Sequence, residues 1–162
     1  LTNLYNRHYL NRYIEKQQGQ AEHIAIWVID VDHFKAYNDH YGHLMGDDAL
    51  KKVASAMQKV ASEHDLLPVR LGGEEFLLVG FEYSLEQAAI IAEQMRSAIE
   101  QMQVEHVASP TNSVLTASIG YMIDRFEHSQ QFTTLLNKAD EALYISKQQG
   151  RNRTTTLQSE TQ

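Results

Sequence analysis

The segment His23–Asp32 (HIAIWVIDVD) most constrains what this chain can fold into, because it is continuously apolar from Ile24 until two acids end it. A continuous apolar run, without the alternation of a half-buried strand, is typical of a strand covered on both faces. The run is also far shorter than the roughly 20 apolar residues that a membrane helix needs. The sequence therefore predicts a central β-strand in a sheet that helices cover on both sides.

The rest of the chain alternates between helical and extended patterns. Gly72-Gly73 permits positive φ at both positions of a tight turn, which predicts a hairpin. Hairpin pairing combined with helical crossovers predicts a mixed sheet flanked by helices, an α+β or α/β sandwich. Asp47 is the expected N-cap of one helix, and Ser84 and Gln87 form a capping box for another. Helices are expected over residues 5–17, 47–63, 84–102 and 135–150, and further strands over 69–71, 76–79, 114–123 and 154–157.

Composition narrows the class of protein further. The chain has 162 residues, 43% of them hydrophobic, which is enough for the core of one globular domain. It has no cysteine, which excludes disulfides, thiolate zinc sites and a cysteine nucleophile. A formal net charge of −7 disfavours nonspecific binding to nucleic acid or to an anionic membrane surface.

The ends of the chain define the expected domain. One domain is expected over residues 1–157, followed by a short disordered tail over residues 158–162. Because the sequence begins with Leu1 rather than Met, we expect a sensor or dimerisation region to precede it in the native protein. No secretory signal is visible in this sequence, so a cytoplasmic location is the simplest expectation.

The acids at the end of the apolar strand are candidates for a metal site. Asp30 and Asp32 are two residues apart, so both side chains point to the same face of a strand. Glu74 and Glu75 directly follow the glycine pair, and Glu74 can join Asp30 on one cation if the hairpin lies beside the central strand. Mg²⁺ prefers a few hard oxygen ligands together with water and phosphate. The alternative, solvated acids at a strand end and on a surface turn, stays open at this point.

Two segments carry cations that could hold phosphate groups. The segment Asp32-His33-Phe34-Lys35 turns directly off the strand, so its backbone N–H groups could bind phosphate oxygens while Lys35 adds a positive charge. The segment Lys147–Asn152 places two cations around the end of the last long helix. The alternative for this second segment is helix capping by lysine and glycine, and these residues alone do not decide between the two.

Taken together, these segments resemble the GGDEF domains of diguanylate cyclases. The residues Gly72-Gly73-Glu74-Glu75-Phe76 are similar to the family signature in its GGEEF form. The resemblance covers residues 1–155, and it is specific because separate segments agree in the order of the family. These are the opening segment 1–7, with Asn3 where glycine is usual, residues 30–35, 38–43 and 46–47, Ser118–Gly120, and the closing segment 139–152.

The resemblance implies a fold like the palm of nucleotidyl cyclases and polymerases, with a central, mainly antiparallel sheet of about five strands flanked by helices. It also implies the condensation of two GTP into cyclic di-GMP and two pyrophosphates. Each subunit of a homodimer would hold one GTP, and the active site would form where two half-sites face each other. Neither a nucleic acid partner nor a membrane contact by this domain is expected.

Carried over by position, the resemblance assigns roles to single residues. Asp30 and Glu74, helped by the Val31 carbonyl, would bind Mg²⁺, with Mn²⁺ as an alternative, and Asp32 would serve a second metal ion. Asn38 and Asp47 would read guanine, because adenine would leave their hydrogen-bonding groups unpaired. The expected catalytic residues are Glu75, which would assist attack by the 3′-hydroxyl, and Lys35, which would neutralise phosphate charge. The remaining phosphate contacts would come from Lys147, Arg151 and the backbone amides near His33 and Phe34.

The chain departs from the family pattern upstream of the signature turn. Many members carry an Arg-x-x-Asp inhibitory site for the product there, whereas the segment Ser62–Pro68 contains no arginine. We therefore expect the primary inhibitory site to be absent and product feedback to be weak. Arg96 lies where the family sometimes places a secondary product contact, although a solvated helix arginine is the simpler interpretation.

Two other functions stay open from the sequence. A catalytically silent GGDEF-like module could bind GTP and regulate a neighbouring domain, although the intact charged positions argue against such a loss of activity. A different nucleotidyl transferase on the same fold is the second alternative. The Asn38 and Asp47 pair and the acidic net charge disfavour a nucleic acid template for it.

Overall fold

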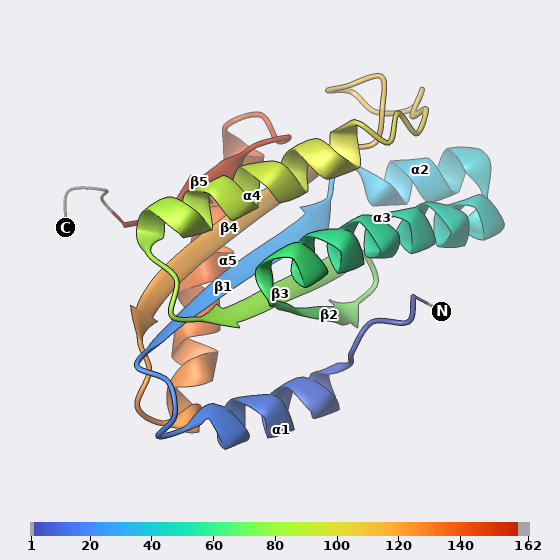
Figure 1. Cartoon of the computed structure of the whole chain (residues 1–162). Coiled ribbons are helices and arrows are strands. Elements are labelled where there is room, and N and C mark those ends of the chain that lie inside the picture. The colour runs from blue at the N-terminus through green and yellow to red at the C-terminus, as the bar shows by residue number, and fades with distance from the viewer. Residues whose placement is uncertain (1, 159–162) are drawn as a thin grey trace.

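The structure, a computed structural model, describes residues 2–158 and contains a five-stranded sheet with helices on both faces (Figure 1). The strand order is β2-β3-β1-β4-β5, in which β4 and β5 are parallel and the other neighbours are antiparallel. The strands are β1 (His23–Val31), β2 (Leu67–Gly72), β3 (Glu75–Phe81), β4 (Ala117–Arg125) and β5 (Thr154–Thr156). The apolar segment is therefore the central strand, and the predicted α+β sandwich with a mainly antiparallel sheet is confirmed.

Two layers of helices enclose the sheet. The described residues form α1 (Arg7–Gln17), α2 (Phe34–Tyr41), α3 (His43–His64), α4 (Leu85–Glu100), the short 3-10 helix η1 (Ser129–Gln131) and α5 (Phe132–Gln148). In Figure 1, α3 and α4 lie in front of the sheet, and α5 lies behind it. Alternate residues of β1 divide between the two cores: Trp27 and Ile29 pack with the α3 and α4 side, and Ile26 and Val28 with the α1 and α5 side.

The helix α2 is one that the sequence analysis did not anticipate. It begins at Phe34, where a turn was expected, and α3 begins at His43, so Asp47 lies inside α3 and the prediction that it caps this helix was wrong. Gly42 separates the two helices with a φ of 90°, a left-handed value that favours glycine. Because a helix this short depends on packing, the burial of Phe34 and Tyr37 stabilises α2 more than its local pattern suggests.

The predicted hairpin lies directly beside the central strand. Gly72 pairs with Glu75, so the two-residue connection is Gly73-Glu74 and not the predicted Gly72-Gly73. A register shift between Arg70 and Gly72 accounts for this difference of one residue. Gly73 has a φ of 50°, and its carbonyl accepts hydrogen bonds from Arg70 Nε and Nη2 at 3.2 and 2.9 Å. Antiparallel pairing of β3 with β1 then brings this turn to the end of β1.

Other element ends differ from the expectation for local reasons. The first helix begins at Arg7 because the Asn6 side chain caps it, accepting from the Tyr9 N–H at 2.9 Å. The fourth strand begins at Ala117, since Val114 forms only an isolated bridge to the loop that precedes the strand. The capping box that opens α4 is confirmed, with both of its hydrogen bonds present.

The end of the described chain lies against the sheet. Gln158, which the sequence analysis placed in a tail, exchanges two hydrogen bonds with the backbone of Ile123, at 2.6 and 2.7 Å. The rest of the expected tail, residues 159–162, and Leu1 lie outside the described residues. Among residues 2–158, no helix has both the length and the hydropathy needed to cross a membrane.

Candidate functional site

Three segments far apart in the sequence meet at one end of the sheet. They are the end of β1 with the following turn, the connection between β2 and β3, and the end of α5 with its following turn. Together they line a cavity of about 180 Å³. Its lining residues, all of them predicted as site residues, are Asp30, Val31, Asp32, His33, Phe34, Lys35, Glu74, Lys147 and Arg151. The candidate cation ligands and the candidate phosphate contacts, which come from these three segments, therefore belong to one site.

The acidic side of this cavity is built by strand register. Asp30 is the partner of Glu75 in the pairing of β1 with β3, and the Val31 N–H donates to the Glu74 carbonyl at 3.2 Å. These pairings hold the turn acids beside the end of β1. Glu74 lines the cavity, whereas Glu75 is exposed and Phe76 is fully buried in the core. The two glutamates thus lie in different surroundings, as expected for neighbours that alternate along a strand.

The Asp30 carboxylate is only 6% exposed and accepts a hydrogen bond from Lys147 Nζ at 2.6 Å. The pKa of Asp30 is raised to about 6, mainly by burial; Lys147 lowers it, and the nearby charges of Glu74 and Glu75 contribute to raising it. A nearby cation stabilises the charged form of a carboxylate that is buried and lies near two other acids. Its surroundings therefore favour a bound positive charge.

The donors around Asp30 fit a hard divalent cation. Asp30 and Glu74 contribute carboxylate oxygens, and Val31 lines the same cavity. Oxygen donors of this kind suit Mg²⁺ or Mn²⁺, and no sulfur or imidazole ligand is needed. The set is small enough to leave coordination positions for water and for substrate phosphates.

Asp32 has a different environment from Asp30. It is 4% exposed, and its carboxylate accepts hydrogen bonds from Thr116 Oγ1 at 2.8 Å, Ser118 Oγ at 2.7 Å and the Asn152 N–H at 3.0 Å. Three protein donors thus use both carboxylate oxygens to tie β1, β4 and the turn after α5 together. Its assignment to a second metal ion stays a prediction.

The cationic side of the cavity comes from both ends of the chain. Lys35 is an exposed residue in the first turn of α2, and Lys147 and Arg151 come from the end of α5. Arg151 Nη1 donates to the Lys147 carbonyl at 3.2 Å, which links the two cations. Gly150, the predicted C-cap region, has a φ of 120° and follows the last helical residues.

The turn that carries Arg151 is held from α4. Arg151 and Asn152 both have left-handed backbone conformations, with φ values of 64° and 48°, which strain Arg151 but are tolerated by asparagine. The Asn152 side chain accepts from Arg96 Nη1 at 2.7 Å and donates to Glu100 Oε2 at 2.5 Å. Arg96 also forms ion pairs with Glu93 and Glu100, so it is a paired residue and not the solvated arginine that was the simpler expectation.

The two residues predicted to read guanine lie outside the cavity lining. Asn38 is on α2 and Asp47 is on α3, both half-buried, where these helices pack against each other. A Cβ on Gly46 would lie 1.7 Å from Asn38 Oδ1, so glycine at this position makes room for the amide. Asn38 Oδ1 is itself buried without a hydrogen-bond partner among the described residues. This unpartnered acceptor lies against Gly46, the residue that precedes Asp47 in α3.

Sequence reasoning missed several residues that shape the site. Thr116 and Asn152 hold Asp32, and His106 contacts the turn after β1 from a loop that precedes β4. Each contact joins residues more than 70 positions apart, and no local pattern marks it. Gly120, by contrast, belongs to the segment Ser118–Gly120 that the resemblance already marked, and a Cβ there would lie 2.2 Å from the Leu143 backbone nitrogen because α5 packs closely on β4.

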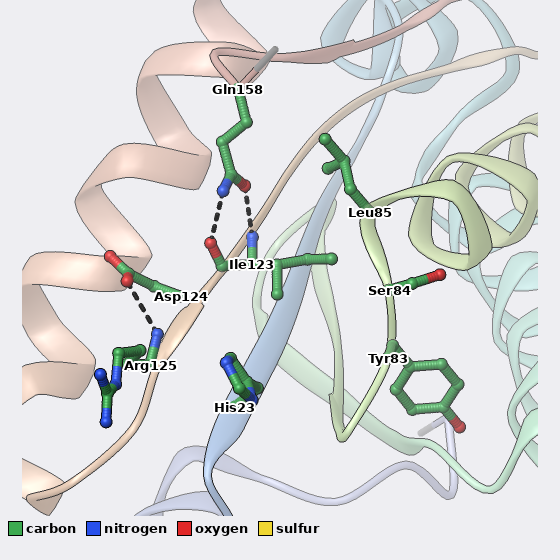
Figure 2. Close-up of a pocket in the computed structure, with 8 residues that line it drawn as sticks. All are labelled: His23, Tyr83, Ser84, Leu85, Ile123, Asp124, Arg125 and Gln158. Carbon is green, nitrogen blue, oxygen red and sulfur yellow. Dashed lines mark hydrogen bonds between the residues drawn. The ribbon is translucent and has the colours of Figure 1, made fainter. Parts of the chain in front are cut away.

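A larger cavity of about 640 Å³ lies at the opposite end of β1 (Figure 2). Figure 2 shows Gln158 bound to Ile123 on one side and Tyr83, Ser84 and Leu85 on the other. Near this end, one group of acids and histidine among residues 2–158 has ligand atoms within 4.8 Å of one another. It consists of Glu22, His23 and Glu82. All three are exposed, and Glu82 Oε1 already accepts from the backbone N–H groups of Glu22 and His23. This end of the sheet therefore lacks the convergence of buried acid and cations found at Asp30.

Comparison with known proteins identifies the class. Residues 1–153 match the family described as "Diguanylate cyclase, GGDEF domain". The chain therefore belongs to the GGDEF-domain family, and the predicted family is confirmed. The matched range contains every lining residue of the cavity around Asp30.

Characterised relatives include diguanylate cyclases of two bacteria. The chain is 34% identical over 158 residues to the diguanylate cyclase VdcA of Vibrio cholerae serotype O1, and 36% identical over 157 residues to the diguanylate cyclase DosC of Escherichia coli. The alignments cover 97% and 94% of this chain but only 46% and 33% of those proteins. The chain thus spans between a third and a half of the length of these relatives.

Solved structures agree with the fold. The GGDEF domain of DgcB from Caulobacter crescentus in complex with c-di-GMP has a TM-score of 0.82 at 29% identity, covering 98% of this chain and 91% of that one. The active GGEEF domain of a diguanylate cyclase from Vibrio cholerae has a TM-score of 0.77 at 30% identity, covering 98% and 100% of the two chains. The palm-like α+β fold expected from the sequence is therefore confirmed.

Proposed function

We propose that this domain is a diguanylate cyclase that condenses two GTP into cyclic di-GMP and two pyrophosphates. The observation that carries the proposal is one cavity with a carboxylate side, Asp30 and Glu74, and a cationic side, Lys35, Lys147 and Arg151. A nucleoside triphosphate with its divalent cation presents the complementary charges to both sides. Membership of the GGDEF family and the similarity to named diguanylate cyclases support the same activity.

The metal in this proposal is Mg²⁺, with Mn²⁺ as an alternative. GGDEF diguanylate cyclases are generally metal-dependent. Asp30, Glu74 and the Val31 carbonyl would hold the cation, and when bound it stabilises negative charge on the α-phosphate and on the attacking and leaving oxygens. Asp32 would act towards a second ion through the acceptor capacity that its three protein donors leave free.

The chain's own residues would bind and orient the nucleotide. Lys35, Lys147 and Arg151 would contact the phosphates, together with the backbone N–H groups at the start of α2. Asp47 would accept hydrogen bonds from the ring N–H and the exocyclic amine of guanine, and the Asn38 amide would donate to the acceptors of the base; adenine would leave these groups unpaired. This arrangement would place the α-phosphate near Asp30 and the base between α2 and α3.

The reaction needs two half-sites. In each transfer a bond forms between the 3′-oxygen of one GTP and the α-phosphorus of the other, and the bond from that phosphorus to pyrophosphate breaks. The 3′-hydroxyl proton passes to a base, a role that we assign to Glu75. Because Glu75 is exposed and pairs with Asp30 across the two strands, it would be available to a nucleotide held by a second copy of the domain. We therefore propose a homodimer as the catalytic unit.

The segment upstream of the signature turn supports weak product inhibition. Ser62–His64 end α3, and Asp65 follows with a φ of 57° as its C-cap. The absence of arginine from residues 62–68 removes the planar cation that would bind product phosphates there. Cyclic di-GMP added at the start of a reaction should therefore slow this domain little.

The test is incubation of the domain with GTP and Mg²⁺ at several protein concentrations, with cyclic di-GMP measured by chromatography. Product that rises more steeply than linearly with protein would support both the cyclase and the dimer. Glu75→Ala should lose product while it still binds GTP. GTP binding without product from wild type at any concentration would favour a silent GTP-binding regulatory module instead.

A further inference from the structure

His106 is a buried histidine that the proposed chemistry does not use. It is 1% exposed and belongs to the loop between α4 and β4, which lies beside α2 at the upper right of Figure 1. Its backbone is fixed by a hydrogen bond from its N–H to the Ser113 carbonyl at 2.9 Å. A polar ring this deeply buried needs a hydrogen-bond partner to offset its lost hydration.

The partner of the ring is the backbone of the turn after β1. His106 Nε2 lies 3.0 Å from the His33 carbonyl oxygen. Since a carbonyl can only accept, Nε2 carries the hydrogen and donates it. The other ring nitrogen, Nδ1, is buried without a partner among the described residues. The imidazole therefore makes one directed hydrogen bond, and that bond goes to the turn that lines the cavity.

Aromatic packing fixes the direction of this hydrogen bond. The Tyr37 ring meets the His106 ring edge-on at 5.2 Å, and Tyr41 lies 6.4 Å away. Tyr41 also accepts a hydrogen bond from the Val107 N–H at 3.0 Å, which ties the loop to α2. The imidazole thus has little freedom to leave the His33 carbonyl.

The peptide group that His106 holds is the one that begins α2. His33 has a left-handed φ of 53° and caps α2 without a side-chain hydrogen bond, so its own conformation is strained. In a planar trans peptide the His33 C=O and the Phe34 N–H point in opposite directions. The same carbonyl also accepts from the Tyr37 N–H at 3.1 Å, the first hydrogen bond of α2, so His106 is a second donor to it. The two donors together fix the carbonyl and, with it, the direction of the Phe34 N–H on the opposite side. Phe34 lines the cavity, and as the first residue of α2 its N–H has no acceptor within the helix.

We propose that His106 is a positioning residue for phosphate binding, which orients the His33–Phe34 peptide so that its N–H donates to a phosphate oxygen of the nucleotide. This inference rests on the proposed function, because it places the triphosphate at the cavity beside Asp30. His106 itself touches no substrate atom. Its effect should therefore concern the phosphates and leave recognition of the base unchanged.

The experiment measures binding without turnover. The dissociation constants of 3′-deoxy-GTP, which lacks the attacking hydroxyl, and of guanosine, which lacks phosphates, are determined in Mg²⁺ for wild type, His106→Leu and His106→Gln. His106→Leu should weaken 3′-deoxy-GTP about five- to tenfold, within the range of one typical hydrogen bond, and change guanosine less than twofold. His106→Gln, whose amide reaches the Nε2 position, should restore 3′-deoxy-GTP binding to within about twofold.

A matched control is His64→Leu, which removes the His64 ring bonded to Gln94 at 2.6 Å and should leave both affinities unchanged. Equal weakening of guanosine and 3′-deoxy-GTP, or no weakening of either, in His106→Leu would overturn the inference. If His106→Leu does not fold, His106→Asn replaces it, because the shorter amide cannot reach the His33 carbonyl. Equal affinities for Asn and Gln would then overturn the inference. Failure of wild type to bind 3′-deoxy-GTP would instead overturn the proposed function, and the inference with it.

Discussion

Lys147 Nζ lies 2.6 Å from Asp30 Oδ2, although the two residues come from opposite ends of the chain. The pair joins α5 to the end of β1 at the wall of the cavity. The ammonium is the counter-ion of a carboxylate that burial has removed from water. A divalent cation at Asp30 would take over that role and leave Lys147 to a phosphate.

The first prediction concerns the pH dependence of stability in a chelator. The pKa of Asp30 is raised from 3.8 to about 6 in the folded protein, mainly by burial. Because the folded protein binds the Asp30 proton more tightly than the unfolded chain does, protonation of Asp30 stabilises the fold. This contribution is fully present below the unfolded pKa of 3.8 and is lost as pH rises through the folded pKa of about 6. Asp30→Asn cannot lose this contribution, so between pH 4 and pH 7.5 its stability relative to wild type should rise by about 2 kcal/mol.

Urea denaturation at several pH values measures this difference. Asp124→Asn is the matched control, because Asp124 also pairs with a lysine of α5, Lys138 at 3.3 Å, but its side chain is 42% exposed. Any change that it shares with Asp30→Asn comes from the loss of a paired carboxylate and not from the burial of the charge. If the free energies of unfolding of Asp30→Asn and wild type change with pH in parallel, the charge on Asp30 is not unfavourable in the folded protein.

The second prediction is that Lys147→Ala changes two affinities in opposite directions. Loss of the ammonium leaves the Asp30 carboxylate without its cation, so Mn²⁺ alone should bind about three- to tenfold more tightly. The same loss removes a phosphate contact, so 3′-deoxy-GTP should bind about tenfold more weakly. Electron paramagnetic resonance measures the affinity for Mn²⁺, and titration calorimetry measures the affinity for 3′-deoxy-GTP. Lys138→Ala, on the same helix, should change neither, and weakening of both ligands by Lys147→Ala would contradict the prediction.

Sequence alone located the site well because its residues follow local patterns. The apolar run that ends at Asp30 and the glycine pair before Glu74 each mark a structural feature, and pairing β3 with β1 was enough to bring them together. Gly150 likewise marked the end of the last helix in the sequence, and Lys147 and Arg151 lie on either side of it. The local patterns did not reveal the hydrogen bonds between distant segments that hold these residues in place.

The missed features depend on tertiary contacts. The α2 helix is short and mostly polar, and it is stabilised by burial of Phe34 and Tyr37 in a core that only the folded chain contains. The role of Asp32 as an acceptor for Thr116 and Ser118 follows from the pairing of β1 with β4, which no spacing within either strand reveals. A carboxylate in a metal-like pattern can therefore be a structural anchor.

The third prediction tests the guanine contacts through Gly46. Gly→Ala inside a helix normally stabilises it by about 1 kcal/mol. At Gly46 the new Cβ would lie 1.7 Å from Asn38 Oδ1, so the amide must move, the gain should vanish and GTP affinity should fall. In an Asn38→Ala background the same substitution should regain its stabilising effect and no longer reduce affinity further. Additive effects of the two substitutions on GTP binding would contradict a shared site.

The fourth prediction concerns the packing of α5 on the sheet. At Gly120 a Cβ would meet only backbone, with Leu143 N at 2.2 Å and Ala139 O at 2.3 Å. Gly120→Ala should therefore push α5 off β4 and destabilise the domain by about 2–3 kcal/mol. Gly80→Ala is the control, since its Cβ would meet side chains, Leu66 Cδ2 at 2.5 Å and Tyr83, that can move. Thermal denaturation should show a clearly larger loss for Gly120→Ala, and equal losses would refute the backbone argument.

The last prediction separates two roles of Asn152, which sits beside Arg151 in the turn after α5. Its left-handed backbone favours asparagine or glycine, and its side chain joins Arg96 to Glu100. Asn152→Gly keeps the backbone conformation and loses only the side-chain contacts, whereas Asn152→Ala loses both. If the turn holds Arg151 for phosphate binding, 3′-deoxy-GTP affinity should fall about threefold in Asn152→Gly and about tenfold or more in Asn152→Ala, with guanosine binding unchanged in both. Arg12→Ala, an exposed residue of α1, serves as the control with no change in either ligand. Equal affinities of the Gly and Ala variants would mean that backbone strain in this turn does not reach Arg151.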